Sequence, residues 1–181
     1  MKKVVKVVSL VLVLIFVISS NLSAQKCKFD YEKKDPLTGE YTRGNTFGVT
    51  LWWFLGINQV NDSYYIGMYV RLSGNLRDII TPENTLIFKL ANGEIITLNA
   101  NNEYLPAANA TQNGVITAYN AQYNISAEDL AKLAASPLVY IKMEIGTIRK
   151  FDQELKEKKG LDFQNKAKCI LQPSSFKFLI K

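Results

Sequence analysis

Hydrophobic and polar residues are patterned most clearly in residues 85–99, where two β-prone runs flank Asn92-Gly93. This pattern predicts a β-hairpin, because Asn-Gly favours a tight reversal of the chain. A two-residue turn would mix polar and apolar side chains on both faces. A three-residue loop with Gly93 in the left-handed conformation instead places five apolar side chains on one face: Leu86, Phe88, Leu90, Ile96 and Leu98. Since a one-residue slip turns a strand over, we predict the three-residue loop and an antiparallel sheet at the centre of the fold.

Alternation of apolar and polar residues predicts several further strands. Residues 35–39 form a turn around a proline and a glycine. Residues 56–62 connect two aromatic-rich strands, 47–55 and 63–72, as a hairpin. Residues 101–113 form a long polar loop, the part of the chain best suited to a mobile flap. The complete set of predicted strands outside the central hairpin is 26–32, 41–43, 47–55, 63–72, 115–125, 138–145 and 151–155.

Two helices are predicted in the C-terminal half. Ser126 precedes residues 127–135 as an N-cap, because its side chain can accept a hydrogen bond from a free N–H at the helix start. Ser136-Pro137 ends this helix. Apolar residues at helical spacing predict a closing helix over residues 161–171, with Gly160 at its start. The expected fold class is therefore mainly β (α+β), an antiparallel β-sheet or sandwich with a short helix after Ser126 and a closing C-terminal helix.

Residues 1–24 have the layout of a secretory signal peptide, with a basic start, an apolar run over residues 7–18 and small or polar residues up to Ala24. A membrane-spanning helix needs roughly 18 or more apolar residues, so we predict cleavage after Ala24 rather than a stable membrane anchor. A lipid anchor is not expected, because Lys26 and not a small residue precedes Cys27. The mature protein is then periplasmic or extracellular.

Cleavage leaves a single β-rich domain over residues 25–172 and a short basic tail over residues 173–181. The formal charge falls from +6 to +3, because residues 1–24 hold three lysines and no acid. Such an ordinary charge gives no reason to expect a nucleic-acid partner. In an exported protein an even pair of cysteines most simply forms one disulfide, so we predict a bond between Cys27 and Cys169.

The chain has no histidine. This absence excludes Ser-His-Asp and Cys-His catalysis and every zinc site that uses histidine. The chain also has no glycine-rich phosphate loop and no acidic D-x-D-x-D run of the kind that binds calcium. We therefore assign no cofactor, no metal and no catalytic residue.

Four aromatic residues fall on one face of the predicted hairpin 47–72: Trp52, Phe54, Tyr65 and Tyr69. One interpretation is a binding patch that stacks against glycan rings or a protein partner. The other is a core face covered by the closing helix, whose apolar stripe needs a surface to pack against. Because exposed aromatic patches are rare in soluble proteins, the pattern favours the covered face.

Carboxylates are the remaining acid–base groups of the usual kind. Asp30, Glu32 and Asp35 cluster near the first turn, while Glu128 and Asp129 open a helix, where its dipole favours negative charge. A glycosidase-like pair requires two carboxyls that face each other across a cleft. The alternation around Asp30 and Glu32 instead predicts solvent-exposed side chains on a polar strand face.

Several structural motifs occur in a characteristic order: the strand end Tyr123-Asn124-Ile125, the helix start at Ser126, the break at Ser136-Pro137 and the closing Cys169-Ile170-Leu171. With the upstream Asn-Gly hairpin, this order resembles a loose group of uncharacterised secreted envelope proteins of Gram-negative bacteria. The resemblance implies export and fold and names no activity. We therefore expect an exported, non-enzymatic binding or assembly module of the cell envelope, with a protein or glycan partner. The alternatives are a hydrolase that uses a carboxylate pair and a purely structural envelope protein.

Overall fold

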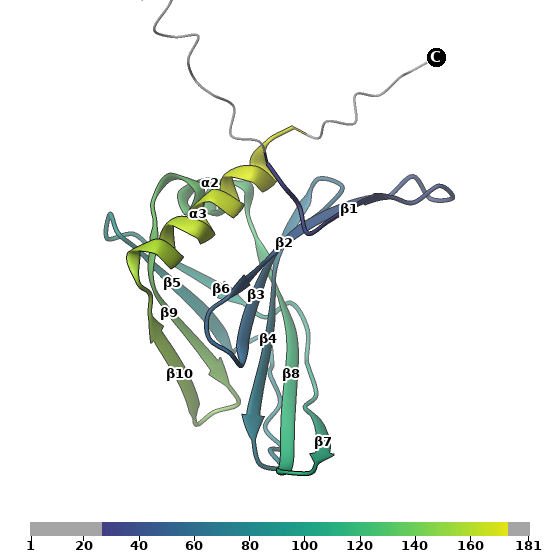
Figure 1. The fold of residues 1–181 in the computed structure, drawn as a ribbon, viewed down its shortest axis with the longest axis vertical. Helices are drawn as coiled ribbons and strands as arrows, with labels where there is room; N and C mark the ends of the chain where they lie inside the picture. The colour runs from purple at the N-terminus through teal and green to yellow at the C-terminus, as the bar shows by residue number, and fades with distance from the viewer. Residues whose placement is uncertain (1–26, 174–181) are drawn as a thin grey trace, which may run out of the picture.

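The computed structural model describes residues 27–173, so the predicted signal peptide and nearly all of the tail lie outside the described residues. Ten strands form two antiparallel sheets, and two helices lie at one end (Figure 1). The six-stranded sheet has the order β1 (Tyr31–Lys34), β2 (Tyr41–Gly48), β3 (Trp53–Val60), β4 (Ser63–Ser73), β8 (Gly114–Ile125) and β7 (Ala107–Thr111). The four-stranded sheet has the order β10 (Arg149–Glu154), β9 (Leu138–Ile145), β5 (Thr85–Leu90) and β6 (Ile95–Asn99). The helices are α2 (Ala127–Ala135) and α3 (Glu157–Leu171).

The two sheets enclose one hydrophobic core, to which every second residue of the longer strands contributes. On β8, for example, Thr117, Tyr119, Ala121 and Tyr123 are all fully buried. The sheets join along one edge, where Ala100, just beyond β6, pairs with Tyr123 of β8. The central antiparallel fold predicted from the sequence is thus confirmed.

Helix α3 packs across both sheets, against β2 and β3 of one and β9 of the other. Its Phe163 ring inserts between Phe47 of the six-stranded sheet, at 5.1 Å between ring centroids, and Phe88 of the four-stranded sheet, at 5.8 Å. Gly160 permits this approach, because a Cβ there would lie 2.2 Å from the Leu138 carbonyl oxygen. Figure 1 shows α3, in yellow-green to yellow, lying at the upper end of the two sheets.

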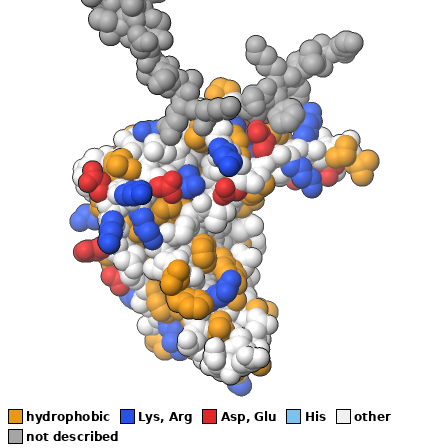
Figure 2. All heavy atoms as spheres, in the orientation of Figure 1, with side chains coloured by type: hydrophobic (Ala, Val, Ile, Leu, Met, Phe, Trp, Pro, Cys, Tyr) orange, Lys and Arg blue, Asp and Glu red, His pale blue; other side chains and the backbone are white. Residues whose placement is uncertain are grey.

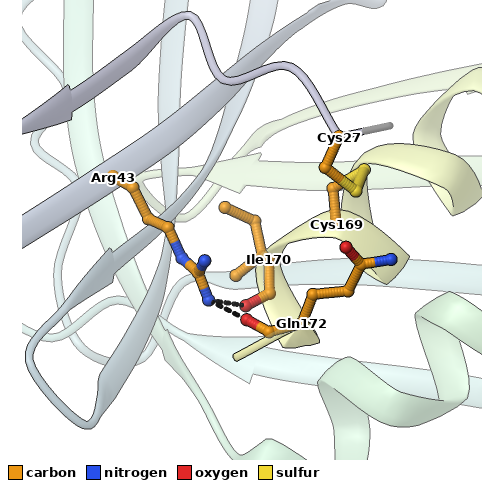
Figure 3. The surroundings of a disulfide bond; sticks show 5 residues. All are labelled: Cys27, Arg43, Cys169, Ile170 and Gln172. Carbon is orange, nitrogen blue, oxygen red and sulfur yellow. Dashed lines mark hydrogen bonds between the residues drawn. A yellow bond between two sulfur atoms is a disulfide. The ribbon is translucent and has the colours of Figure 1, made fainter. Parts of the chain in front are cut away.

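The C-terminal end of α3 is fixed by a disulfide and by a buried arginine (Figure 3). The disulfide joins Cys169 to Cys27. The Arg43 guanidinium is almost fully buried, and its Nη2 donates to the carbonyl oxygens of Ile170, at 2.7 Å, and of Gln172. These carbonyls lie at the negative end of the helix dipole, which stabilises a cation. The predicted pairing of the two cysteines is confirmed.

The predicted hairpin, short helix and following strand are confirmed in detail. Leu86 pairs with Leu98 and Phe88 with Ile96, and Gly93 has a φ of 90°. Ser126 caps α2 by accepting from the Asp129 backbone N–H at 3.0 Å. Both α2 and β9 have the bounds that the sequence predicts.

The predicted strand over residues 47–55 is wrong. The chain reverses at residues 49–52, where the Val49 and Thr50 N–H groups both donate to the Trp53 carbonyl oxygen, at 2.9 and 3.1 Å. Residues 56–62, predicted as the link, are mostly the second half of β3. The tight turn lies instead at Asn61, whose φ of 51° is in the left-handed region that asparagine tolerates. The alternation of apolar residues runs through the true turn without a break, so the pattern concealed it.

Further boundaries differ from the prediction, including the end of the strand predicted over residues 41–43, which as β2 continues to Gly48. The predicted loop 101–113 contains β7, which pairs with β8 although its alanines and asparagine have low β propensity. The first strand begins at Tyr31 and not at residue 26. Helix α3 begins at Glu157, so Gly160 lies inside the helix and not at its start. In each case tertiary pairing or packing outweighs the local preference of the sequence.

Reduction of the disulfide should lower the free energy of unfolding. The bond links residues 142 positions apart, for which chain entropy alone gives an upper value of about 5 kcal/mol. Denaturant titration of the native protein and of the Cys27→Ser/Cys169→Ser variant measures the difference, and intact mass with and without reductant reports the state of the bond. Equal unfolding midpoints, or two thiols alkylated in the native protein, would contradict this prediction.

Substitution of Gly160 by alanine should displace α3 from β9. The added methyl meets the Leu138 carbonyl oxygen, a backbone atom that cannot rotate away, so we expect a loss of about 1–3 kcal/mol of stability despite the better helix propensity of alanine. Gly48→Ala is the matched control, since its Cβ would meet only the Phe54 ring at 3.8 Å. Chemical denaturation compares the two variants, and an unchanged midpoint for Gly160→Ala would contradict the close packing.

Candidate functional site

The outer face of the six-stranded sheet carries the aromatic residues singled out in the sequence. Residues directly opposite each other in an antiparallel pair share a face. Phe54 is opposite Tyr69, and Asn58 is opposite Tyr65. Their strand neighbours Trp53, Leu55, Ile57, Ile66, Met68 and Val70 are buried in the core. The face that holds Phe54, Asn58, Tyr65 and Tyr69 therefore points away from the core.

One end of this face holds the tryptophan cluster, which we define as Trp52, Phe54, Tyr69 and Arg71. Trp52 is 54% exposed and lies in the β2–β3 turn, held beside β4 by its carbonyl oxygen, which accepts from the Arg71 N–H at 2.9 Å. The Phe54 and Tyr69 rings lie 6.5 Å apart. The Arg71 guanidinium stacks 5.3 Å from the Tyr69 ring centroid and donates to its hydroxyl at 3.0 Å. Figure 2 shows hydrophobic side chains gathered around a basic one over this part of the sheet.

The other end holds the tyrosine cluster, defined as Tyr31, Asn58 and Tyr65. The Tyr31 hydroxyl donates to the Asn58 Oδ1 at 2.7 Å. Partial burial, together with the charge and hydrogen bonding of the neighbouring Tyr65 hydroxyl, raises the pKa of Tyr31 to about 12. Tyr31 is therefore neutral at physiological pH, and the two phenols and the amide form one connected polar group.

A strip of glycine separates the two clusters. Gly56 and Gly67 pair directly with each other on this face, so neither central strand places a side chain there. A Cβ at either position would lie 3.0 or 3.2 Å from the Asn58 Nδ2, so the amide of Asn58 reaches over both glycines. We call Gly56 and Gly67 the glycine floor. Asn58 follows Phe54 by four positions along β3, which places the two clusters about 13 Å apart.

The polar groups of this face are almost all uncharged. Among the residues that β2, β3, β4 and β8 turn outward, Arg71 alone carries a charge. The other polar side chains are amides and hydroxyls, and those of Asn120, Gln122 and Asn124 on β8 are exposed. The face thus combines aromatic rings, amides and bare backbone.

The structure overturns the favoured expectation that the closing helix covers this face. Helix α3 turns its Phe163, Ala167 and Ile170 toward the core between the sheets, where all three are fully buried. Trp52 is exposed, and Phe54, Tyr65 and Tyr69 are half-buried. The structure brings these four residues to one face, as the sequence predicted, and leaves that face without cover from α2 or α3.

The sequence prediction missed Tyr31, Asn58 and the glycine floor. Gly56 and Asn58 lie in the segment 56–62 that the sequence predicts as a connection, and Tyr31 lies in the predicted first strand without any sign of a site. The available signal was the spacing of Gly56, Asn58 and Gly67 on the phase opposite to the core residues. Those residues can be assigned to the outer face only when the β2–β3 turn is placed at residues 49–52.

The carboxylates singled out in the sequence have structural contacts. Asp30 accepts from the Thr46 N–H at 2.6 Å, and Glu32 accepts from the Tyr41 hydroxyl. Backbone N–H groups of the first turn lower the pKa of Asp35. Glu128 and Asp129 both pair with Lys132, at 3.2 and 2.8 Å. These contacts give the hydrolase alternative no support.

Within residues 27–173, no group of three or more acidic or cysteine side chains lies close enough to hold a metal ion. No helix in this part of the protein is long and apolar enough to cross a membrane. Comparison with known protein families, with curated proteins and with solved structures finds no match for this chain. Its function therefore has to be inferred from the chemistry of the outer face.

Trp52 and Trp53 are adjacent in sequence and should behave oppositely on truncation. Trp53 is 4% exposed, so Trp53→Ala should cost roughly 3–5 kcal/mol of stability. Trp52 is 54% exposed, so Trp52→Ala should change stability by about 0.5 kcal/mol or less. Chemical denaturation of both variants measures this contrast. A sharply lowered midpoint for Trp52→Ala would show that the ring is buried in solution.

Proposed function

We propose that this protein is an exported, non-enzymatic binding module that binds a neutral glycan on the outer face of its six-stranded sheet. The observation that carries this proposal is the tryptophan cluster, where an exposed indole and two half-buried rings stand beside uncharged amides. Aromatic rings stack on the apolar C–H faces of sugars, and amides both donate to and accept from hydroxyl groups.

The charge of the face favours a glycan over other partners. A nucleic acid requires several cations along its phosphates. On this face, Arg71 is the one charged side chain among the outward residues of β2, β3, β4 and β8. A ligand rich in hydroxyls satisfies the amides without leaving a buried charge unpaired. Trp52 is exposed and lies on the same face as the half-buried Phe54 and Tyr69, and such a grouping of aromatic residues favours a site over an ordinary surface.

The proposed location is the periplasm or the extracellular space. The bond between Cys27 and Cys169 supports it, because disulfides persist in oxidising compartments. The signal-like pattern of residues 1–24 supports it independently. Membership in the group of secreted envelope proteins that the motifs resemble belongs to the same proposal.

A glycan array tests the proposed function. The mature protein should bind one or more neutral glycans, and Trp52→Ala should lose the signal. Ile95→Ala is the matched control, because Ile95 is 64% exposed on the outer side of the other sheet, and it should bind as the wild type does.

Equal unfolding midpoints for the two variants would show that any loss is local. The proposal is overturned if no glycan binds, or if Trp52→Ala binds as well as Ile95→Ala. Binding of the same face to a protein, without any glycan, would place the chain in the other class of binding module.

A further inference from the structure

We infer that the ligand is an extended oligosaccharide that spans both aromatic clusters and receives a hydrogen bond from the Asn58 amide over the glycine floor. This inference rests on the proposed function and deepens it. It adds the length of the ligand, its path across the sheet and a polar residue that positions it.

The spacing of the clusters sets the length. Phe54 and Tyr69 mark one end, and Asn58 and Tyr65 mark the other, four residues along each strand. This separation, about 13 Å, is too great for one sugar ring stacked on the tryptophan cluster to reach the tyrosine cluster. A ligand that contacts both must be a chain of several units lying along β3 and β4.

The Asn58 amide supplies the polar contact between the clusters. The side chain is nine-tenths buried, and its Oδ1 is occupied by the Tyr31 hydroxyl. Its Nδ2 reaches over Gly56 and Gly67, and within the described part of the chain it has no hydrogen-bond acceptor. The Nδ2 atom does not belong to the fully buried polar atoms without a partner, so it can reach a ligand on the outer face. A hydroxyl, a ring oxygen or an acetamido carbonyl of the ligand would accept a hydrogen bond from it.

The glycine floor lies on the path that the inferred oligosaccharide takes across the sheet. Glycine in a strand interior costs roughly 0.5–1 kcal/mol relative to alanine, and it commonly marks a close approach to the backbone. Neither Gly56 nor Gly67 has a positive φ, so the backbone conformation does not require glycine at either position. Methyl groups there would press on the Asn58 Nδ2 and fill the space above the floor. The two glycines therefore make room for the Asn58 amide, which reaches over them between the two clusters and can donate to a ligand that spans both.

Calorimetric titration with oligomers of increasing length tests the inference. Three neutral series serve as probes, each from one to six units: β-1,4-linked N-acetylglucosamine, cello-oligomers and malto-oligomers. In at least one series the affinity of the mature protein should rise tenfold or more with length. Tyr65→Ala should abolish this gain and keep the weak binding of short oligomers. Tyr140→Ala, a half-buried tyrosine on the outer side of the four-stranded sheet, should keep the gain.

Two conservative variants test the floor and the amide. Gly67→Ala should still fold, because its methyl meets only a side-chain atom, the Asn58 Nδ2 at 3.2 Å, which has to shift to make room. This displacement of the amide should weaken the longest oligomer about tenfold, equivalent to roughly 1.4 kcal/mol. Asn58→Asp keeps an oxygen that accepts from Tyr31 and removes the donor, so it should weaken the same oligomer without affecting single sugars.

The outcomes separate this inference from the proposed function. A flat dependence of affinity on length, full length dependence in Tyr65→Ala, or wild-type binding by both Gly67→Ala and Asn58→Asp overturns the inference. The proposed function survives those results if Trp52→Ala still abolishes array binding. Failure of all three series to bind also overturns the extended site, and the array alone then decides whether the face binds another glycan.

Discussion

The insertion of Phe163 between the two sheets is the contact on which the rest of the fold depends. The sheets join at the β6–β8 edge, and α3 packs against β2 and β3 of one sheet and β9 of the other. The ring touches Phe47 on one sheet and Phe88 on the other, and Gly160 allows the helix backbone to approach β9. The disulfide and the buried Arg43 hold the far end of the helix in register. Together these contacts turn two sheets into one core.

The same packing leaves the outer face of the six-stranded sheet open. An amphipathic helix has one apolar stripe, and α3 buries its stripe inside the sandwich. β3 turns Trp53, Leu55 and Ile57 into the core and Phe54, Gly56 and Asn58 outward, so one phase forms core and the other forms the outer face. Trp53 and Trp52 show the division, since the first is buried and the second exposed. In a module built this way, substitutions of the outer residues can alter ligand specificity while the core residues stay the same.

Stability and recognition are therefore separable on one pair of strands. Leu55, Ile57, Ile66 and Met68 are buried and fix the sheet in place. The residues between them, Phe54, Gly56, Asn58, Tyr65, Gly67 and Tyr69, occupy the outer face. Glycine at the floor gives up strand stability to make room for the Asn58 amide, and the well-packed core compensates. The rigid sheet holds the two clusters at a fixed distance, which a loop-based site would not.

Local interactions determined what the sequence alone could predict. The Asn92-Gly93 hairpin, the Ser126 cap, the end of α2 and the start of β9 depend on residues near one another in the chain, and each is confirmed. The pairing of Cys27 with Cys169 followed from there being two cysteines in a chain expected to be exported. Tertiary structure alone decided the reversal at residues 49–52, the pairing of β7 and the side on which α3 packs. The physical reason is that alternation shows which residues share a face, whereas only packing decides which face is covered.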